Sequence, residues 1–247
     1  QGILYGTTDS NGNLTQSGYV DVVGAAVEAD IEGLAGYTTK FSDTTNSYIK
    51  LNDGRYTQPT TEMTISLHII PNNTPTADEY IISKLYEYYI YIDSNKQVNV
   101  GLYPESASES TNLAVELKST SSIPADNQTP TNIIVTLDTR LKSGNVKLYI
   151  DGKLEDQSGL RKTTGTKNNW PTGISLENFT SDLYIGAKDV NVSRYDGKIE
   201  EFMIYNKLLY PVTPNDETFI FKKPVKELTD ATEAVSRSYS GKLFIKE

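Results

Sequence analysis

Three acidic side chains at alternate positions form the chain's first candidate for chemistry. They lie in the run Glu28-Ala29-Asp30-Ile31-Glu32. Alternate residues of a β-strand point to one face, so Glu28, Asp30 and Glu32 would share a face if this run is extended. Two carboxyl groups that flank one sugar linkage can serve as nucleophile and acid in its hydrolysis. The alternative is an acidic strand or loop that faces water.

The other polar candidates are weaker. The sequence contains one histidine, His68, and no cysteine. Because no serine–aspartate pair or metal-ligand companion accompanies His68 locally, we interpret it as a residue on a sheet face. Asp9, Asn11 and Asn13 have the spacing of a calcium loop, but Val20 stands where such loops need a bidentate glutamate. We therefore interpret residues 9–13 as a polar turn.

Trp170 is the only tryptophan, and it lies in a long polar stretch, 158–177. Basic side chains share this stretch, namely Arg161, Lys162 and Lys167. An ordered rim loop could offer the Trp170 ring to a ligand, or the ring could cover the edge of the fold. Both alternatives are open from the sequence.

Tyrosines crowd one predicted strand, at Tyr86, Tyr88, Tyr89 and Tyr91. Such a cluster could stack against sugar rings. Tyrosine is also a good strand former, and its hydroxyl reaches water from a half-buried site. We favour the structural role for this cluster.

Composition limits the classes of partner. The net charge of −9 comes with no local basic stripe, which argues against nucleic acids and anionic lipid surfaces. No apolar run approaches the roughly 20 residues that a membrane helix needs. The lack of cysteine argues against a small disulfide-stapled module and leaves prokaryotic exported proteins and virion proteins open. The sequence starts at Gln1, so a leader was either removed or omitted. We expect an extracellular, cell-surface or virion-surface location.

Short runs of β-branched and aromatic residues between polar turns predict an all-β protein. In the run 63–71, alternation would point Ile65, Leu67 and Ile69 toward a core and Ser66 and His68 away from it. Further strands are expected at 19–32, 36–43, 48–51, 80–93, 97–103, 113–117, 131–138, 144–152, 183–186 and 199–205. We expect hairpins between 36–43 and 48–51 and between 80–93 and 97–103, and neighbouring antiparallel strands at 183–186 and 199–205.

Several runs resemble motifs of one family. Segment 183–210 contains Ile-Gly, a polar loop and then Arg-Tyr-Asp-Gly-Lys-Ile-Glu-Glu, followed by Ile-Tyr-Asn. It resembles the C-terminal signature of the laminin-G-like (LamG) jelly rolls, relatives of the concanavalin A-like lectins and glucanases. Residues 63–71 and 144–152 resemble two further strand motifs of that family, and the resemblance covers roughly residues 2–211.

The resemblance implies a two-sheet antiparallel jelly-roll sandwich over residues 1–211. Residues 212–247 would then form a C-terminal extension or arm, with a short helix at 230–237 and a last strand at 242–245. Arms with a terminal strand often pair with another subunit, so self-assembly through this segment is a further expectation.

The resemblance also implies site residues. LamG-like domains often have an acidic residue at the position of Glu200 and often hold calcium, and Asp43 would be a second ligand. Because Phe202 and Ile204 match core positions, period two places Glu200 on the inward face as well. There a carboxylate needs either a cation or hydrogen bonds from turn amides, and both alternatives are open.

We expect ligand contacts at Trp170, Arg194 and Tyr195. Laminarinase-type glycosidases share the wider fold, and their catalytic motif has the spacing of Glu28 and Glu32. They carry it on a central strand in a tryptophan-rich cleft, whereas here it precedes the first long core strand. We therefore predict a non-catalytic surface module that acts in adhesion, glycan contact or assembly and binds a glycan or protein partner. The alternative is a glycosidase that uses Glu28 and Glu32.

Overall fold

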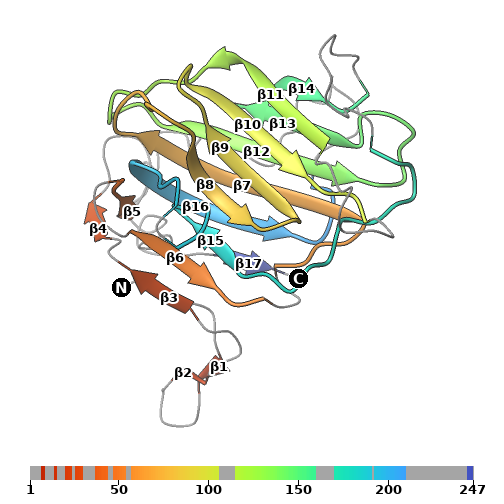
Figure 1. Cartoon of the computed structure of the whole chain (residues 1–247), viewed down its shortest axis with the longest axis horizontal. Coiled ribbons are helices and arrows are strands. Elements are labelled where there is room, and N and C mark those ends of the chain that lie inside the picture. The colour runs from red at the N-terminus through yellow and green to blue at the C-terminus, as the bar shows by residue number, and fades with distance from the viewer. Residues whose placement is uncertain are drawn as a thin grey trace, which may run out of the picture.

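The computed structural model describes residues 7–8, 14–15, 20–23, 26–29, 37–43, 47–53, 57–105, 115–159, 170–190, 192–209 and 244–246. Two large β-sheets are stacked face to face around a shared core (Figure 1). These residues include no helix, and hence none long and apolar enough to cross a membrane. The predicted all-β jelly-roll sandwich is confirmed.

The seven-stranded sheet lies toward the viewer in Figure 1. Its strands pair antiparallel throughout. Their spatial order is β11 (Val115–Ser122), β10 (Gln97–Leu102), β9 (Tyr88–Ile92), β8 (Glu79–Lys84), β15 (Leu183–Ile185), β6 (Tyr48–Leu51) and β3 (Val20–Val23).

The eight-stranded sheet packs behind it. Its main path runs through β14 (Lys153–Gln157), β13 (Val146–Ile150), β12 (Thr131–Asp138), β7 (Glu62–Pro71), β16 (Gly197–Tyr205), β5 (Tyr37–Phe41) and β4 (Ala26–Ala29). The remaining strand, β17 (Phe244–Lys246), pairs with β16 in parallel. A separate two-stranded ribbon joins β1 (Thr7–Thr8) to β2 (Leu14–Thr15).

The core lies between the sheets and follows the alternation expected of strands. In β7, Ile65, Leu67 and Ile69 are at most 1% exposed and belong to the main apolar cluster. His68 lies on the other face, in register with Asn132 of β12. The hydrophobic effect over these inward residues holds the sheets together.

Two predicted strand pairs are wrong. Strand β15 pairs with β6 and β8 in the seven-stranded sheet, whereas β16 pairs with β7 and β5 in the other sheet. Strands β5 and β6 are likewise divided between the sheets. The reason is that each of these apolar strands has a core face that either sheet can bury, and consecutive strands of a sandwich often cross between layers.

The predicted strand 80–93 is interrupted. Strand β8 ends at Lys84, and β9 begins at Tyr88 after a turn that Glu87 N closes by donating to Lys84 O at 3.0 Å. Tyr86 has φ 62°, a left-handed conformation that a continuous strand does not contain. The turn therefore makes β8 and β9 adjacent antiparallel strands.

The inward position predicted for Glu200 is wrong. A bulge interrupts the pairing of β16 with β7 between Glu200 and Met203. Ile199 before the bulge and Phe202 after it both lie in the core, and Glu200 is in register with His68 on the outer face. The extra residue of the bulge shifts the alternation, which a strict period of two does not anticipate.

The end of the predicted arm contains a strand, β17, beside Met203, Ile204 and Tyr205 of the same chain. The predicted helix at 230–237 lies outside the described residues, as does the stretch 9–13. The proposed boundary at residue 211 also lies outside them and stays a prediction.

Candidate ligand-binding face

The outer face of the seven-stranded sheet carries tyrosines from several strands. In β9, Tyr88 and Ile90 point into the core, and alternation directs Tyr89 and Tyr91 outward. Across the ladder, Tyr91 is in register with Tyr80 of β8. Pairs in register lie on the same face of a sheet, so these outward rings meet.

Four of these rings form a continuous group, which we call the tyrosine patch: Tyr80, Tyr89, Tyr91 and Tyr103. Tyr80 and Tyr91 are stacked, with centroids 5.0 Å apart. Tyr89 lies 5.8 Å from Tyr80 and 6.2 Å from Tyr103. Tyr80 is 8% exposed and the other three rings are half-buried, so the patch offers an aromatic surface rather than isolated side chains.

A glycine makes room for one of these rings. Gly101 of β10 is in register with Tyr89, and a Cβ at Gly101 would lie 2.1 Å from Tyr89 Cζ. The ring can lie across the neighbouring strand only because Gly101 has no side chain. The Tyr89 hydroxyl then donates to Glu116 Oε1 at 2.8 Å, which holds the ring in this orientation.

The patch is polar as well as aromatic. Burial raises the pKa of Tyr80 to about 12 and raises the pKa of Tyr103 as well. Both phenols are therefore neutral at physiological pH and keep a hydroxyl that donates and accepts. The Lys188 ammonium lies 5.2 Å from the Tyr80 ring centroid, a cation–π contact at the border of the patch.

Tyr86 extends the patch at the turn between β8 and β9. Its ring is 6.2 Å from that of Tyr103 and 5.3 Å from that of Phe179. Tyr86 is 48% exposed. The turn and the segment that carries Phe179 are joined by Ser181 Oγ, which donates to Leu85 O at 2.9 Å.

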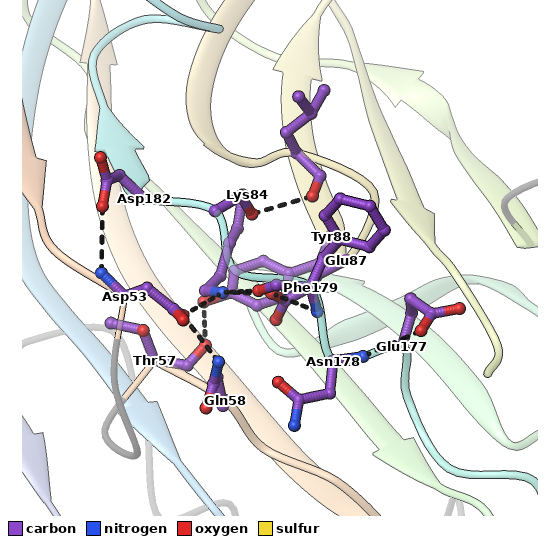
Figure 2. Close-up of polar contacts among 12 residues, drawn as sticks. Asp53, Thr57, Gln58, Lys84, Glu87, Tyr88, Glu177, Asn178, Phe179 and Asp182 are labelled. Atoms are coloured by element: carbon purple, nitrogen blue, oxygen red, sulfur yellow. Dashed lines mark hydrogen bonds and ion pairs between the residues drawn. The ribbon is translucent and has the colours of Figure 1, made fainter. Parts of the chain in front are cut away.

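A buried charge cluster below this turn fixes both segments (Figure 2). Lys84 Nζ donates to Asp53 Oδ1 at 2.8 Å and to Phe179 O at 3.2 Å, and it forms an ion pair with Glu87. Glu87 Oε1 accepts the Phe179 amide at 3.1 Å. The backbone of Phe179 is thus held through both its N–H and its carbonyl.

The cluster is an unusual place for charges, since the side chains of Lys84 and Glu87 are 0% exposed. Burial raises the pKa of Glu87 to about 7, although Lys84 and the Phe179 amide act in the opposite direction. Asp53 is 24% exposed, and its Oδ1 also accepts from Gln58 Nε2 at 2.6 Å. A buried carboxyl group with a raised pKa, such as that of Glu87, is a candidate for chemistry as well as for structure.

A family model described as the concanavalin A-like lectin/glucanases superfamily matches residues 43–212. The chain belongs to this superfamily. No curated protein matches the chain.

This superfamily member is similar to several solved structures. The binding domain of Paraclostridial Mosquitocidal Protein 1 aligns at a TM-score of 0.57 and 14% identity, over 82% of this chain and 47% of that one. The binding domain of botulinum neurotoxin serotype G has a TM-score of 0.48 and 17% identity, over 76% and 44%. Domain 4 of the arabinanase AbnA from Geobacillus stearothermophilus, in complex with arabinotriose, has a TM-score of 0.47 and 19% identity, over 81% and 86%. The chain thus spans about half of the two toxin domains.

The predicted ligand contacts lie in different settings. Trp170 is 3% exposed in the core, and its indole N–H donates to Ile174 O at 2.8 Å. Tyr195 is 0% exposed, and its hydroxyl donates to Lys198 O at 3.3 Å. Arg194 is half-buried, and its backbone forms a bridge with Tyr80 of the tyrosine patch. Of these three residues, only Arg194 is next to the patch.

The predicted calcium ligands belong to neighbouring segments of the eight-stranded sheet, one in β16 and one just after β5. Asp43 is exposed two residues after β5, and Glu200 is 7% exposed in β16. The described residues hold no group of three or more histidine, aspartate or glutamate side chains placed to bind a metal ion. Calcium at Asp43 and Glu200 stays a prediction.

The acidic run is only partly described. Glu28 lies in β4, the last strand on the β5 side of the eight-stranded sheet, in register with Thr38. Asp30 and Glu32 lie outside the described residues. The glycosidase alternative therefore stays a prediction.

Sequence reasoning named part of the tyrosine cluster but not its partners. Tyr80 and Tyr103 were missed, although outward tyrosines at matching positions of adjacent strands are a usable signal once the turn at residues 85–87 is known. The charge cluster was also missed. Its signal is the presence of Lys84 and Glu87 within an otherwise apolar and aromatic run.

Proposed function

We propose that this domain is a non-catalytic module of an exported protein and that it binds glycan chains through the tyrosine patch. The supporting observation is the group of contiguous rings on the outer face of a sheet. Sugar rings have apolar faces and hydroxyl edges, and tyrosine matches both with an aromatic face and a hydroxyl. Half-buried rings fixed by neighbours lose little conformational entropy when a ligand binds.

The residues around the patch complete this surface. Glu116 accepts from the Tyr89 hydroxyl, and Lys188 lies over Tyr80, so charged hydrogen-bonding groups border the aromatic rings. A few polar groups around an apolar platform are typical of small-molecule sites. The mosquitocidal toxin domain that shares the fold is a binding domain. At 14% identity that likeness concerns the fold, and the proposal rests on the patch.

The test is a glycan array followed by calorimetry on the best ligand. Replacement of one stacked ring by Tyr91→Ala is expected to weaken binding about fivefold, since a ring contact contributes about 1 kcal/mol. The matched control is Tyr205→Ala in β16 of the other sheet, which should bind like the native protein. Thermal unfolding shows that both variants fold.

Light scattering separates glycan binding from assembly. A monomer that binds on the array supports the module proposed here. An oligomer that binds no glycan would instead favour a structural subunit joined through residues 212–247. Equal binding by native protein and Tyr91→Ala would contradict the role of the patch.

A further inference from the structure

The buried charge cluster brings an amine against a carboxyl group. Lys84 lies at the end of β8, and Asp53 follows β6 by two residues. These two strands flank β15 in the seven-stranded sheet. Lys84 Nζ is 2.8 Å from Asp53 Oδ1, and Figure 2 shows the Glu87 carboxyl group on the other side of the same nitrogen. The three side chains come together although Lys84 and Asp53 are 31 residues apart.

Glu87 has the properties of a proton carrier. Its side chain is 0% exposed and contacts Lys84 Nζ through Oε1. Its second oxygen, Oε2, is buried and has no hydrogen-bond partner in the described part of the chain. A buried carboxylate oxygen without a donor is costly, so this oxygen is better suited to carry a proton. The raised pKa, about 7, agrees with that assignment.

We propose that Lys84 and Asp53 form an intramolecular isopeptide bond, with Glu87 carrying the proton between them. The Lys84 ammonium passes a proton by way of Glu87 to the Asp53 carboxylate. The neutral amine then attacks Asp53 Cγ, so the N–C bond forms. The bond from Cγ to one carboxyl oxygen breaks, and that oxygen leaves as water with two protons that came from the amine. Nothing is oxidised or reduced, and no co-reactant is needed.

The surroundings favour this condensation. The fold holds the two reacting groups in contact, which removes the entropic cost of an encounter in solution. A desolvated lysine is a stronger nucleophile than one in water. Gln58 Nε2 donates to Asp53 Oδ1 at 2.6 Å, where negative charge develops when the amine adds. Because the Asp53 side chain is 24% exposed while Lys84 is fully buried, the leaving water has an exit at Asp53.

The proposal is independent of glycan binding, and the mass of the full chain tests it. Under denaturing conditions the native protein should be lighter than its sequence by one water molecule. A tryptic digest should contain residues 51–55 joined to residues 56–96, uncut after Lys84. Lys84→Arg and Glu87→Gln should each have the full sequence mass. The control Lys118→Arg, which alters an exposed lysine beside Asp93, should keep the loss of water.

Two results would overturn the proposal. One is a native protein with its full sequence mass. The other is a loss of water that persists in Lys84→Arg, because a cyclic imide formed by Asp53 and Gly54 would lose water without using the lysine. If Glu87→Gln does not fold, the variant Asp53→Asn provides a second test of the bond. It should give the same joined peptides with release of ammonia in place of water, and two separate peptides from this variant would count against the bond.

Discussion

Two lysines of the seven-stranded sheet each contact an aspartate, and the two contacts differ in burial rather than in length. Lys84 Nζ lies 2.8 Å from Asp53, and Lys118 Nζ lies 2.6 Å from Asp93. The Lys84 side chain is 0% exposed, whereas that of Lys118 is 40% exposed. Water can therefore replace Asp93 as a partner of Lys118, but it cannot replace the partners of Lys84.

The pKa values of Glu87 and Asp93, one at each site, are shifted in opposite directions. Burial dominates at Glu87 and raises its pKa. Burial also acts upward on Asp93, but hydrogen bonds from Lys118, Gln97 and Asn95 outweigh it, so the pKa of Asp93 lies below its usual value. The lesson is that the balance between burial and donated hydrogen bonds, and not one short ion pair, decides the charge state of a carboxyl group.

The largest expected difference concerns removal of each lysine charge. Lys84→Met takes from the buried Glu87 and from Asp53 the nitrogen that both contact, whether it is a cation or is already bonded to Asp53, and it should lower the free energy of unfolding by at least about 3 kcal/mol. Lys118→Met should lower it by less than about 1 kcal/mol, because the pair is exposed. Urea unfolding of both variants measures the contrast. Similar losses of unfolding free energy in the two variants would contradict the idea that burial separates the two sites.

The pH dependence of stability should differ in sign between the sites. The pKa of Glu87 is raised, so the folded state binds more protons than the unfolded state between pH 4.5 and about 7, and stability falls as pH rises through that window. The pKa of Asp93 is lowered, so its contribution is present above pH 3.8 and is lost as pH falls below that value.

The pH experiment compares melting curves of native protein, Glu87→Gln and Asp93→Asn. Glu87→Gln should remove part of the decline between pH 4.5 and about 7, and Asp93→Asn should leave that decline unchanged. Glu79, whose pKa burial also raises to about 7, contributes a decline of the same sign. The informative quantity is therefore the difference from the native protein, and a Glu87→Gln curve parallel to the native one would refute the assignment.

The smallest expected effect separates two roles of Asp93. Its Oδ1 accepts the amides of Asn95 at 2.9 Å and Gln97 at 3.1 Å, which closes the turn between β9 and β10. Asp93→Asn keeps an oxygen for these amides and should cost well under about 1 kcal/mol. Asp93→Ala removes the acceptor and should cost about 1 kcal/mol. Equal unfolding midpoints for the two variants would show that the turn amides do not need Asp93.

The fold was predictable where alternation and turn chemistry are local. Ile65, Leu67 and Ile69 follow period two through β7, and all three are in the core. The turn at Asp151 and Gly152, with φ 48° and 79°, also follows from sequence, since Asp-Gly favours a tight hairpin. Neither feature depends on residues distant in the chain.

The rest depends on contacts that local patterns do not contain. Strand β15 joins the seven-stranded sheet because it pairs with β6 and β8, which come from distant parts of the chain. Glu200 points outward because a bulge in β16 shifts the alternation. The candidate face is a similar case. The tyrosines were visible in the sequence, but only the turn at Tyr86 decides which of them point outward. Lys84 and Asp53 meet only after β6 and β8 have paired with β15 between them.

Strand β17 has a consequence for the order in which the sandwich is completed. It pairs with Met203–Tyr205 of β16, beyond the stretch Gly197–Ile199 that β5 covers. A ribosome finishes residues 1–209 before it adds residues 244–246, so the newly made sandwich exposes a short row of unpaired backbone groups until its last strand arrives. Such a row can accept a strand from any chain. Strand β17 of the same chain thus competes with strands of other chains for this position.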